Sequence, residues 1–380
     1  MEYRWIEDID EFRRIAGKWD GALLASGEDN PFLLSDFLLT WWRHYSKGFK
    51  LRVFVLLRDG QIVGGLPLAA DRRGCLEYPG GINANYTEFL SVGGGLPFWD
   101  YFVRGLHEFK GWRCVRLKRF REDRLNAPKL RGAVDEHKGM IMDIYDSDPT
   151  YLIDIPQDFK GYINRLPKKL RYYVKRSEEE FSKLGTLGLA SPKSPAEVIA
   201  LADTCIGFSR DSFRRRKRQS AFEDSANCLF FKELMSSFFK AGYLDANALT
   251  LNGRTIAVHF GYSIANNLNY IFPSFDAEFA RFNPGHLLIY KLVELGSKRK
   301  NRLFDLYTGG SLYKEQWSDR KENVVSVEMR PDLARSRVAR MVERQLRTSP
   351  IVRKAKKAIK SSARLSSFLS SARKLVREHV

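Results

Sequence analysis

The strongest constraint on the fold of this chain is an order of elements that occurs twice. In each half an extended run turns at a glycine and returns as a second extended run, which indicates a β-hairpin, and a helix and a further strand follow. The hairpin glycines, Gly60 and Gly253, lie 193 residues apart, and the later strands at 112–117 and 301–306 lie 189 residues apart. These near-equal offsets favour an internal duplication. A hairpin followed by a helix and a strand also occurs in unrelated α+β domains, and that alternative stays open.

The duplication predicts an α/β fold of the α+β kind, with mixed sheets in two related domains. We expect one domain at 1–150, a second at 151–330 and a tail at 331–380. The boundary falls at 145–160, where acidic residues and prolines interrupt the apolar periodicity. With 380 residues, 44% of them hydrophobic, the chain can bury two cores, which excludes an intrinsically disordered protein.

The excess of positive charge lies mainly in the tail. The net charge is +19, and the 14 basic and 3 acidic residues of 331–380 supply +11 of it. Apolar side chains recur there at helical spacing between arginines and lysines, which predicts basic amphipathic helices at an anionic membrane surface. Soluble helices that pack on the rest of the chain, or disorder, are the alternatives.

The cysteines and the absence of apolar segments indicate a cytosolic protein. Cys75, Cys114, Cys205 and Cys228 form no CxxC pair in a long chain, so we expect four thiols, no disulfide scaffold and no metal site. The N-terminus lacks a basic start with an apolar run, and no stretch of about 18 apolar residues occurs. We therefore expect cytoplasmic localisation, with peripheral contact at the inner face of the membrane through the tail.

One strand-to-helix junction has the features of an anion site. The segment 272–288 leads from a strand into a helix whose first turn is Pro284, Gly285 and His286. Unpaired N–H groups at a helix start, with glycine allowing close approach, suit a pyrophosphate. Asn-Pro-Gly is also a common way to begin a helix, so the signal alone is weak.

Two strands carry candidate catalytic side chains. His259 shares a strand face with Ala257 and Gly261 and can face a cleft as a base, although a lone strand histidine is often structural. Asp305 ends a strand just before a Thr-Gly-Gly loop. A catalytic or acceptor-positioning role and a role in holding this loop are both open for its carboxylate.

A resemblance to a known family rests on three runs. NGRTIAVHFGYS at 252–263, YIFPSFDAEFARFNPGHLLIYKLVE at 270–294 and LFDLYTGGSLYKEQW at 303–317 resemble the acyltransferase domain of the GNAT superfamily, in its CelD/BcsL branch associated with cellulose and other exopolysaccharides. Its best motifs are FDxxFxRxxPG and YKxxW, and it extends over roughly 5–330. The tandem GNAT-like arrangement is also similar to the Fem peptidoglycan aminoacyltransferases.

The resemblance implies that an acyl-CoA, most simply acetyl-CoA, lies between two splayed strands with its pyrophosphate on the next helix start. An acceptor then attacks the thioester, assisted by a base and a proton donor. By this resemblance we assign cofactor binding to Phe272, Arg281, Asn283, Gly285, His286 and Leu287. We assign catalysis to His259, Asp305, Tyr313 and Lys314, with Trp317 as a packing residue. The usual pyrophosphate loop, Q/R-x-x-G-x-G/A, is reduced here to Arg281-Phe-Asn-Pro-Gly-His, which leaves the donor in doubt.

Two basic clusters, at 165–176 and 210–218, remain. These clusters can simply be solvated surfaces. If they are functional, they bind an anionic acceptor such as a lipid-linked or phosphorylated sugar, the phosphates of CoA, or RNA. The leading hypothesis is an acyltransferase that moves an acyl group from acyl-CoA to an amine or hydroxyl of a sugar, polysaccharide or lipid-linked envelope precursor. The alternatives are a Fem-like transferase that uses aminoacyl-tRNA, and a non-catalytic module that binds membranes or anionic polymers.

Overall fold

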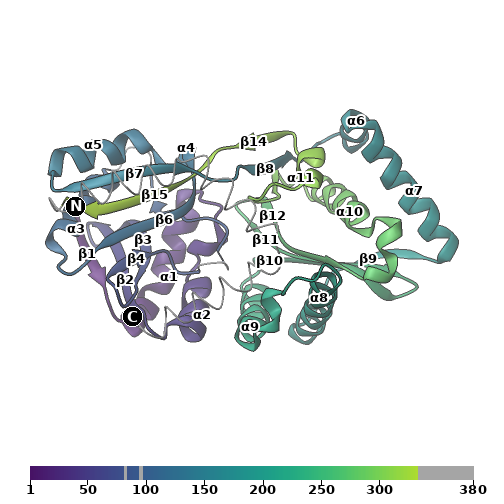
Figure 1. Ribbon diagram of the computed structural model, residues 1–380, viewed down its shortest axis with the longest axis horizontal. Coiled ribbons are helices and arrows are strands. Elements are labelled where there is room, and N and C mark those ends of the chain that lie inside the picture. Colours follow the sequence, from purple (N-terminus) through teal and green to yellow (C-terminus); the bar gives the residue numbers. More distant parts are fainter. Residues whose placement is uncertain (81–83, 94–96, 333–380) are drawn as a thin grey trace.

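The computed structural model describes residues 1–80, 84–93 and 97–332, and shows two domains, each with a mixed sheet covered by helices (Figure 1). Nearly all of the predicted tail, 333–380, lies outside the described residues. The α/β fold class expected from the sequence is confirmed. Within the described part of the chain, no helix is both long and apolar enough to cross a membrane.

The first domain contains an eight-stranded sheet. Its elements are β1 (Glu2–Ile6), α1 (Ile9–Ser26), η1 (Pro31–Leu33), α2 (Ser35–Tyr45), β2 (Lys50–Arg58), β3 (Gln61–Ala70), β4 (Cys75–Glu77), β5 (Leu90–Ser91), α3 (Phe98–Glu108), β6 (Cys114–Arg121), α4 (Glu122–Leu125), α5 (Ala127–His137), β7 (Met140–Asp146) and β15 (Val324–Pro331). The strand order is β1-β2-β3-β4-β6-β15-β7, and β5 pairs with β3.

The second domain contains a seven-stranded sheet in the order β14-β8-β13-β12-β11-β10-β9. Its elements are β8 (Thr150–Asp154), α6 (Phe159–Arg165), α7 (Lys168–Leu184), β9 (Leu187–Ala190), α8 (Pro195–Arg215), η2 (Ala221–Glu223), α9 (Ser225–Lys240), β10 (Leu244–Leu251), β11 (Arg254–Ile264), β12 (Asn267–Phe275), η3 (Ala277–Phe282), α10 (Pro284–Lys298), β13 (Leu303–Asp305), α11 (Leu312–Trp317) and β14 (Arg320–Glu322).

The repeated order inferred from the sequence is visible in both sheets. The hairpins β2–β3 and β10–β11 turn at Asp59-Gly60 and Asn252-Gly253, and all four turn residues have positive φ, between 50° and 81°. In the first domain, α3 leads into β6, which pairs in parallel with β4. In the second domain, α10 leads into β13, which pairs in parallel with β12. Such a parallel pair requires a crossover connection, which the helix supplies.

The last strand does not follow the domain limits expected from the sequence. Residues 324–331 form β15, which returns to the first sheet and pairs with β6 and β7 (Figure 1). The predicted unit 151–330 therefore gives its final strand to the other domain. The period of apolar residues marks a buried strand but not the sheet in which it pairs, so sequence patterning could not place it.

Apolar packing joins the two domains on one side of the second sheet. The helices α8 and α9 cover this side, and their apolar residues share one continuous core with the first domain. At the contact, the rings of Phe37 in α2 and Phe230 in α9 lie 6.1 Å apart, and Tyr45 donates a hydrogen bond to Asn227 at 2.6 Å. The helices α6, α7 and α10 form a separate core on the other side of the sheet.

The expectation of four free thiols is wrong for one pair. Cys75 in β4 and Cys114 in β6 form a disulfide, with their Cα atoms 4.6 Å apart. These residues are 39 positions apart but lie directly side by side in the parallel register of the two strands. No local motif encodes this pairing, because it arises from the sheet. Cys205 and Cys228 are free.

Candidate active site

Two neighbouring parallel strands of the second sheet separate at the centre of the domain. The pairing of β12 with β13 covers only Asn267 to Asn269 against Leu303 to Asp305, whereas β12 continues to Phe275. The register between β11 and β12 shifts at the same level, because Phe260 pairs with Phe272 but Gly261 pairs with Tyr270. Such a bulge adds one residue and bends the strand.

Gly261 makes this bend sterically possible. A Cβ atom at this position would lie 1.7 Å from the carbonyl oxygen of Asn269. Only glycine therefore fits where the two backbones approach most closely.

A cleft of about 390 Å³ lies beside β12 where the strands separate. It is lined by Ser209, Ser212, Phe213 and Arg216 of the α8 end and its following turn, by Tyr270, Pro273, Ser274 and Phe275 of β12, by Ala280, by Asn283, Pro284, Gly285, His286, Leu288 and Ile289 at the start of α10, and by Tyr313 of α11. Of the predicted site residues, the structure brings Asn283, Gly285, His286 and Tyr313 together in this cleft. The residues of α8 and β12 that line it were not predicted as site residues, apart from the basic cluster noted near Arg216.

The start of α10 presents its first turn to the cleft. Asn283 adopts a left-handed conformation, with φ of 53°, and Pro284 occupies the first helical position. Gly285 follows with open space, since a Cβ atom there would lie 3.8 Å from the Phe275 ring. The N-terminal N–H groups and the helix macrodipole favour an anion at this end of the cleft.

The imidazole of His286 has a defined tautomer. Trp317 donates its indole N–H to Nδ1 of His286 at 3.0 Å. Burial lowers the pKa of His286, so the neutral form is favoured. Because an indole N–H only donates, Nδ1 accepts, and the proton of His286 is on Nε2. Trp317 itself is fully buried, consistent with the expected packing role.

Tyr313 and Lys314 are adjacent but have different environments. Burial raises the pKa of Tyr313 to about 12, so its hydroxyl stays protonated at neutral pH and can donate a proton or hydrogen bond into the cleft. Lys314 Nζ donates to the carbonyl oxygens of Tyr307 at 3.2 Å and Thr308 at 2.7 Å. Burial lowers the pKa of Lys314 to about 8. Lys314 thus holds the loop after β13.

Asp305 lies at the junction of the two domains. Its carboxylate accepts hydrogen bonds from Tyr86 at 2.8 Å, from Thr150 at 2.9 Å and from the Tyr307 N–H at 2.7 Å. Burial raises the pKa of Asp305 to about 6, although Arg121 and these hydrogen bonds act to lower it. The donor Tyr86 comes from the first domain, so the strand end is tied to its neighbour.

His259 is fully buried behind the cleft wall. Its Nε2 lies 3.3 Å from the carbonyl oxygen of Asn269, and its Nδ1 lies 3.7 Å from Asp245. The ring stacks on Tyr270, with the centroids 4.9 Å apart, and Tyr270 lines the cleft. Burial lowers the pKa of His259, so the neutral ring is favoured.

The other predicted cofactor residues lie outside the cleft. Phe272 lines an adjoining, mainly apolar cavity of about 350 Å³ between β12, α8 and α9, which shares Ser209, Phe213, Pro273 and Ser274 with the cleft. Leu287 is fully buried in the core under α10. Arg281 lines a groove of about 400 Å³ with Arg176 and Lys183, and this groove shares Asn283 with the cleft.

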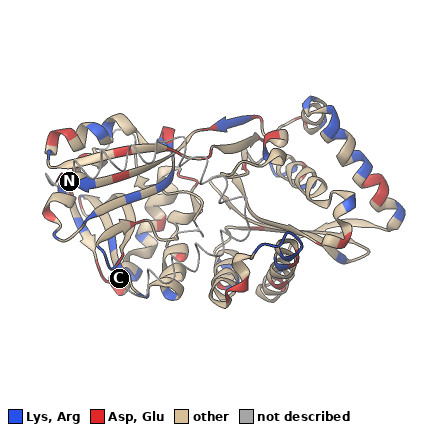
Figure 2. Cartoon of the chain, in the orientation of Figure 1, with Lys and Arg blue, Asp and Glu red and all other residues tan. Residues whose placement is uncertain are grey.

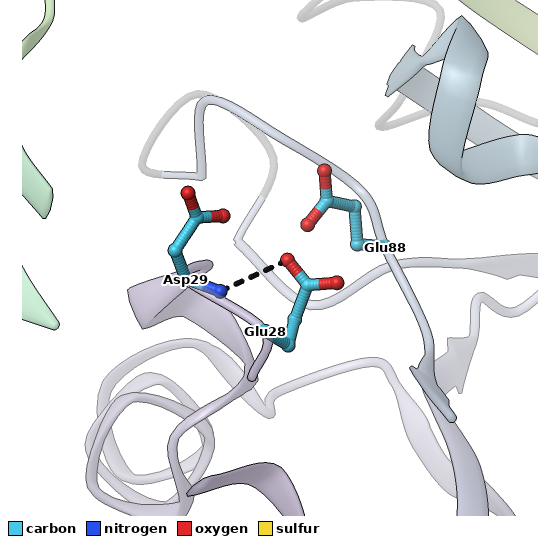
Figure 3. Close-up of side chains that lie close together, drawn as sticks. All are labelled: Glu28, Asp29 and Glu88. Carbon is cyan, nitrogen blue, oxygen red and sulfur yellow. Dashed lines mark hydrogen bonds between the residues drawn. The ribbon is translucent and has the colours of Figure 1, made fainter. Parts of the chain in front are cut away.

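A buried acidic cluster in the first domain was not predicted. The carboxylates of Glu28, Asp29 and Glu88 lie close together (Figure 3), and one oxygen of each lies within 4.8 Å of the others, a geometry that can hold a metal ion. The Arg121 guanidinium instead pairs with all three, at 2.9 Å from Glu28 and 2.5 Å from Asp29. Burial and Glu88 raise the pKa of Glu28, whereas Arg121 outweighs burial and lowers the pKa of Asp29. Asn267 of β12 donates to Asp29 at 2.5 Å and links the cluster to the second domain.

Comparisons with known proteins give a family match and several similar folds. Residues 168–315, less than half of the chain, match the family described as acetyltransferase (GNAT) domain. A FemX crystal structure is similar with a TM-score of 0.60 at 10% identity, over 86% of this chain and 97% of that chain. L-PGS from Bacillus licheniformis is similar with a TM-score of 0.52 at 10% identity, over 82% and 90% of the two chains. No curated protein sequence matches the chain. At these identities the solved structures show a shared fold, and the CelD/BcsL branch is not confirmed.

Proposed function

We propose that the protein is an acyltransferase of the CelD/BcsL type that transfers an acyl group, most simply acetyl, from acyl-CoA to an amine or hydroxyl of a sugar, polysaccharide or lipid-linked envelope precursor. The observation that carries this proposal is the cleft beside β12, beyond the point where β13 stops pairing with it, which the first turn of α10 lines at one end. This is the position that a GNAT-type donor requires.

The donor's phosphates fit the end of the cleft at the start of α10. The pyrophosphate would lie at the first turn of α10, on the N–H group of Gly285, where the positive end of the helix dipole stabilises it. The adjoining groove with Arg176, Lys183 and Arg281 would bind a further phosphate. Phe272 and Leu287 would then act on the donor only by packing, since neither lines the cleft.

The residues of the cleft support direct transfer. The nitrogen or oxygen of the acceptor forms a bond to the thioester carbon, the carbon–sulfur bond breaks, and the acceptor's proton is released to solvent. The leaving sulfur takes a proton from the Tyr313 hydroxyl, whose raised pKa keeps it protonated before the step, and the resulting phenolate regains a proton from solvent. We assign positioning roles to three residues. Lys314 and Asp305 hold the loop after β13 by hydrogen bonds, and His259 supports Tyr270 by stacking behind it.

Calorimetric titration of the full chain with acetyl-CoA and longer acyl-CoAs tests the proposal. We expect one site per chain, lost in Gly285→Trp because the large side chain fills the helix entrance. Gly285→Ala is the matched control, since a Cβ atom at this position meets only ordinary contacts with Phe275. A folded protein that binds no CoA ester would rule out the proposed donor.

A second candidate is a Fem-like transferase that uses aminoacyl-tRNA. It is favoured by the match to FemX over 97% of that chain, and by the exposed basic side chains of α7, such as Lys168 and Arg171. It predicts tRNA binding that weakens steeply with salt, and no affinity for CoA. A third alternative is a non-catalytic module that binds anionic polymers or the cytoplasmic membrane face through 331–380. In that case, replacing Tyr313 would leave the function intact.

A further inference from the structure

The helix α8 ends in a run of five basic residues, Arg214–Arg218, which we call the basic turn. All five residues are exposed, and Figure 2 shows the basic run at the end of α8. Its backbone is ordered by hydrogen bonds from Lys217 to Arg214 and from Arg218 to Phe213, each at 2.9 Å. Lys217 adopts a left-handed conformation, with φ of 52°. The charges are therefore held in a defined turn rather than on a loose extension.

The basic turn borders the proposed active site. Ser212, Phe213 and Arg216 line the same cleft as Gly285 and Tyr313. Because α8 packs on one side of the second sheet and α10 on the other, the cleft reaches both sides beside β12. The donor's phosphates belong to the α10 side in the proposed function. The α8 side is then left for the acceptor.

Most charges of the basic turn lack a counter-charge within the described residues. An ion-pair partner is found there for Arg214 alone, with Asp211 at 2.9 Å. Arg210, one turn earlier, differs because its guanidinium donates twice to the carbonyl oxygen of Phe222, at 3.0 and 2.6 Å. Arg210 therefore stabilises the fold, whereas Arg215, Arg216 and Lys217 concentrate positive potential at the cleft. Such a field raises the local concentration of anions and steers them inward.

We propose that the acceptor carries a phosphate group, which the basic turn binds while the acceptor's amine or hydroxyl lies in the cleft. This inference rests on the proposed function. Several guanidinium groups close together match the geometry of a doubly charged phosphate, to which arginine donates two parallel hydrogen bonds. The phosphate takes no part in the transfer step: the acceptor forms the bond to the acyl carbon, the carbon–sulfur bond breaks, and the phosphate stays attached to the product.

The test is a titration of the full chain with inorganic pyrophosphate at low salt, after CoA has saturated the donor site. The test variant is Arg215→Ala/Arg216→Ala/Lys217→Ala. The matched control, Lys168→Ala/Arg171→Ala/Lys175→Ala, removes three exposed charges from α7. We expect one further pyrophosphate site per chain in the wild type and the control, weakened at least tenfold in the basic-turn variant. Circular dichroism checks that both variants fold.

No pyrophosphate binding by the CoA-bound wild type, or an equal loss in both variants, would overturn the inference. If CoA itself does not bind, the proposed function fails separately. The same two variants titrated without CoA then still report whether the basic turn binds pyrophosphate.

Competition identifies the source of the phosphate. Displacement of pyrophosphate by glucosamine 6-phosphate but not by glucosamine indicates a soluble phosphorylated sugar. Displacement by vesicles that contain a polyprenyl diphosphate indicates a lipid-linked acceptor. Displacement by neither, or only by an oligoribonucleotide, contradicts the proposal.

Discussion

The two domains begin the equivalent helix in opposite ways. In the second domain, α10 starts with Pro284, Gly285 and His286, which line a cleft. In the first domain, α3 follows Pro97 and starts with Phe98 and Trp99, which are only 2% and 3% exposed. Phe98 and Trp99 also border a smaller pocket, of about 220 Å³, but they do so with their own rings. The same hairpin, helix and strand order therefore surrounds a helix start with an accessible glycine in one domain and a helix start filled by aromatic rings in the other.

Aromatic side chains occupy the helix start in the first domain. The Phe89 ring packs on Phe98 and Trp99, with centroids 4.4 and 4.7 Å away. Gly64 in β3 leaves room for this packing, since a Cβ atom there would lie 2.9 Å from Phe98. The comparison indicates that a repeated fold can keep the same order of elements in both copies while only one copy offers the proposed ligand site. We infer that the first domain supports the second.

The largest effect should follow the loss of Arg121, because it would leave three buried carboxylates without their main counter-charge. Arg121→Met should lower the free energy of unfolding by about 3–5 kcal/mol in urea denaturation. Arg124→Met, at a half-exposed side chain, is the control with a smaller expected loss. If a divalent cation restores the stability of Arg121→Met, the cluster can bind a metal ion. The first domain would then have a ligand site of its own, which would contradict the contrast between the two domains.

Asp305 should give the domain junction a pH dependence. Its pKa is raised from 3.8 to about 6, so the folded state binds the proton more tightly than the unfolded state, and stability falls as pH rises between these values. The loss should approach about 3 kcal/mol above pH 6 at most. Urea unfolding from pH 4 to 7 should show it in the wild type and not in Asp305→Asn. If the free energy of unfolding changes with pH in the same way in both proteins, Asp305 is not the cause of the pH dependence.

Tyr313→Phe should slow transfer without weakening donor binding. The hydroxyl is the proton donor assigned to the leaving sulfur, and such groups contribute about a hundredfold or more. We expect kcat to fall by about that factor, with KM for acetyl-CoA nearly unchanged, when thiol release is followed with glucosamine 6-phosphate as acceptor. Tyr290→Phe, on the same side of the sheet but outside the cleft, should retain the wild-type rate. Equal rates for all three proteins would refute the role.

The smallest effect concerns the feature that the domains share. Gly60 and Gly253 have φ of 74° and 81°, and a Cβ atom at either position would meet no packing neighbour within 4 Å. Gly60→Ala and Gly253→Ala should each cost about 1 kcal/mol of stability, from the left-handed backbone alone. Unequal losses in thermal unfolding would show that the two hairpin turns are not equivalent.

Features with a local cause could be predicted from the sequence. The turns at Gly60 and Gly253 require positive φ, and the Pro-Gly start of α10 follows the preferences of a first helical turn. The repeat and the helix entrance were therefore accessible without a structure.

Features that depend on pairing between distant segments were not accessible. The Cys75–Cys114 bond and the return of β15 to the first sheet follow from strand order, and the Arg121 cluster joins side chains about 90 residues apart in sequence. His259 lies on the predicted strand, but the close approach of Asn269 at Gly261 buries it behind Tyr270. No periodicity in the sequence encodes such approaches.

The contrast between the helix starts is tested most directly by hydrogen–deuterium exchange of the full chain with and without saturating CoA. We expect slower exchange in β12 at 270–275 and at the start of α10 at 283–289, and no change at the start of α3 at 97–103. Protection at the α3 start, or none at α10 in a protein that binds CoA, would contradict the contrast.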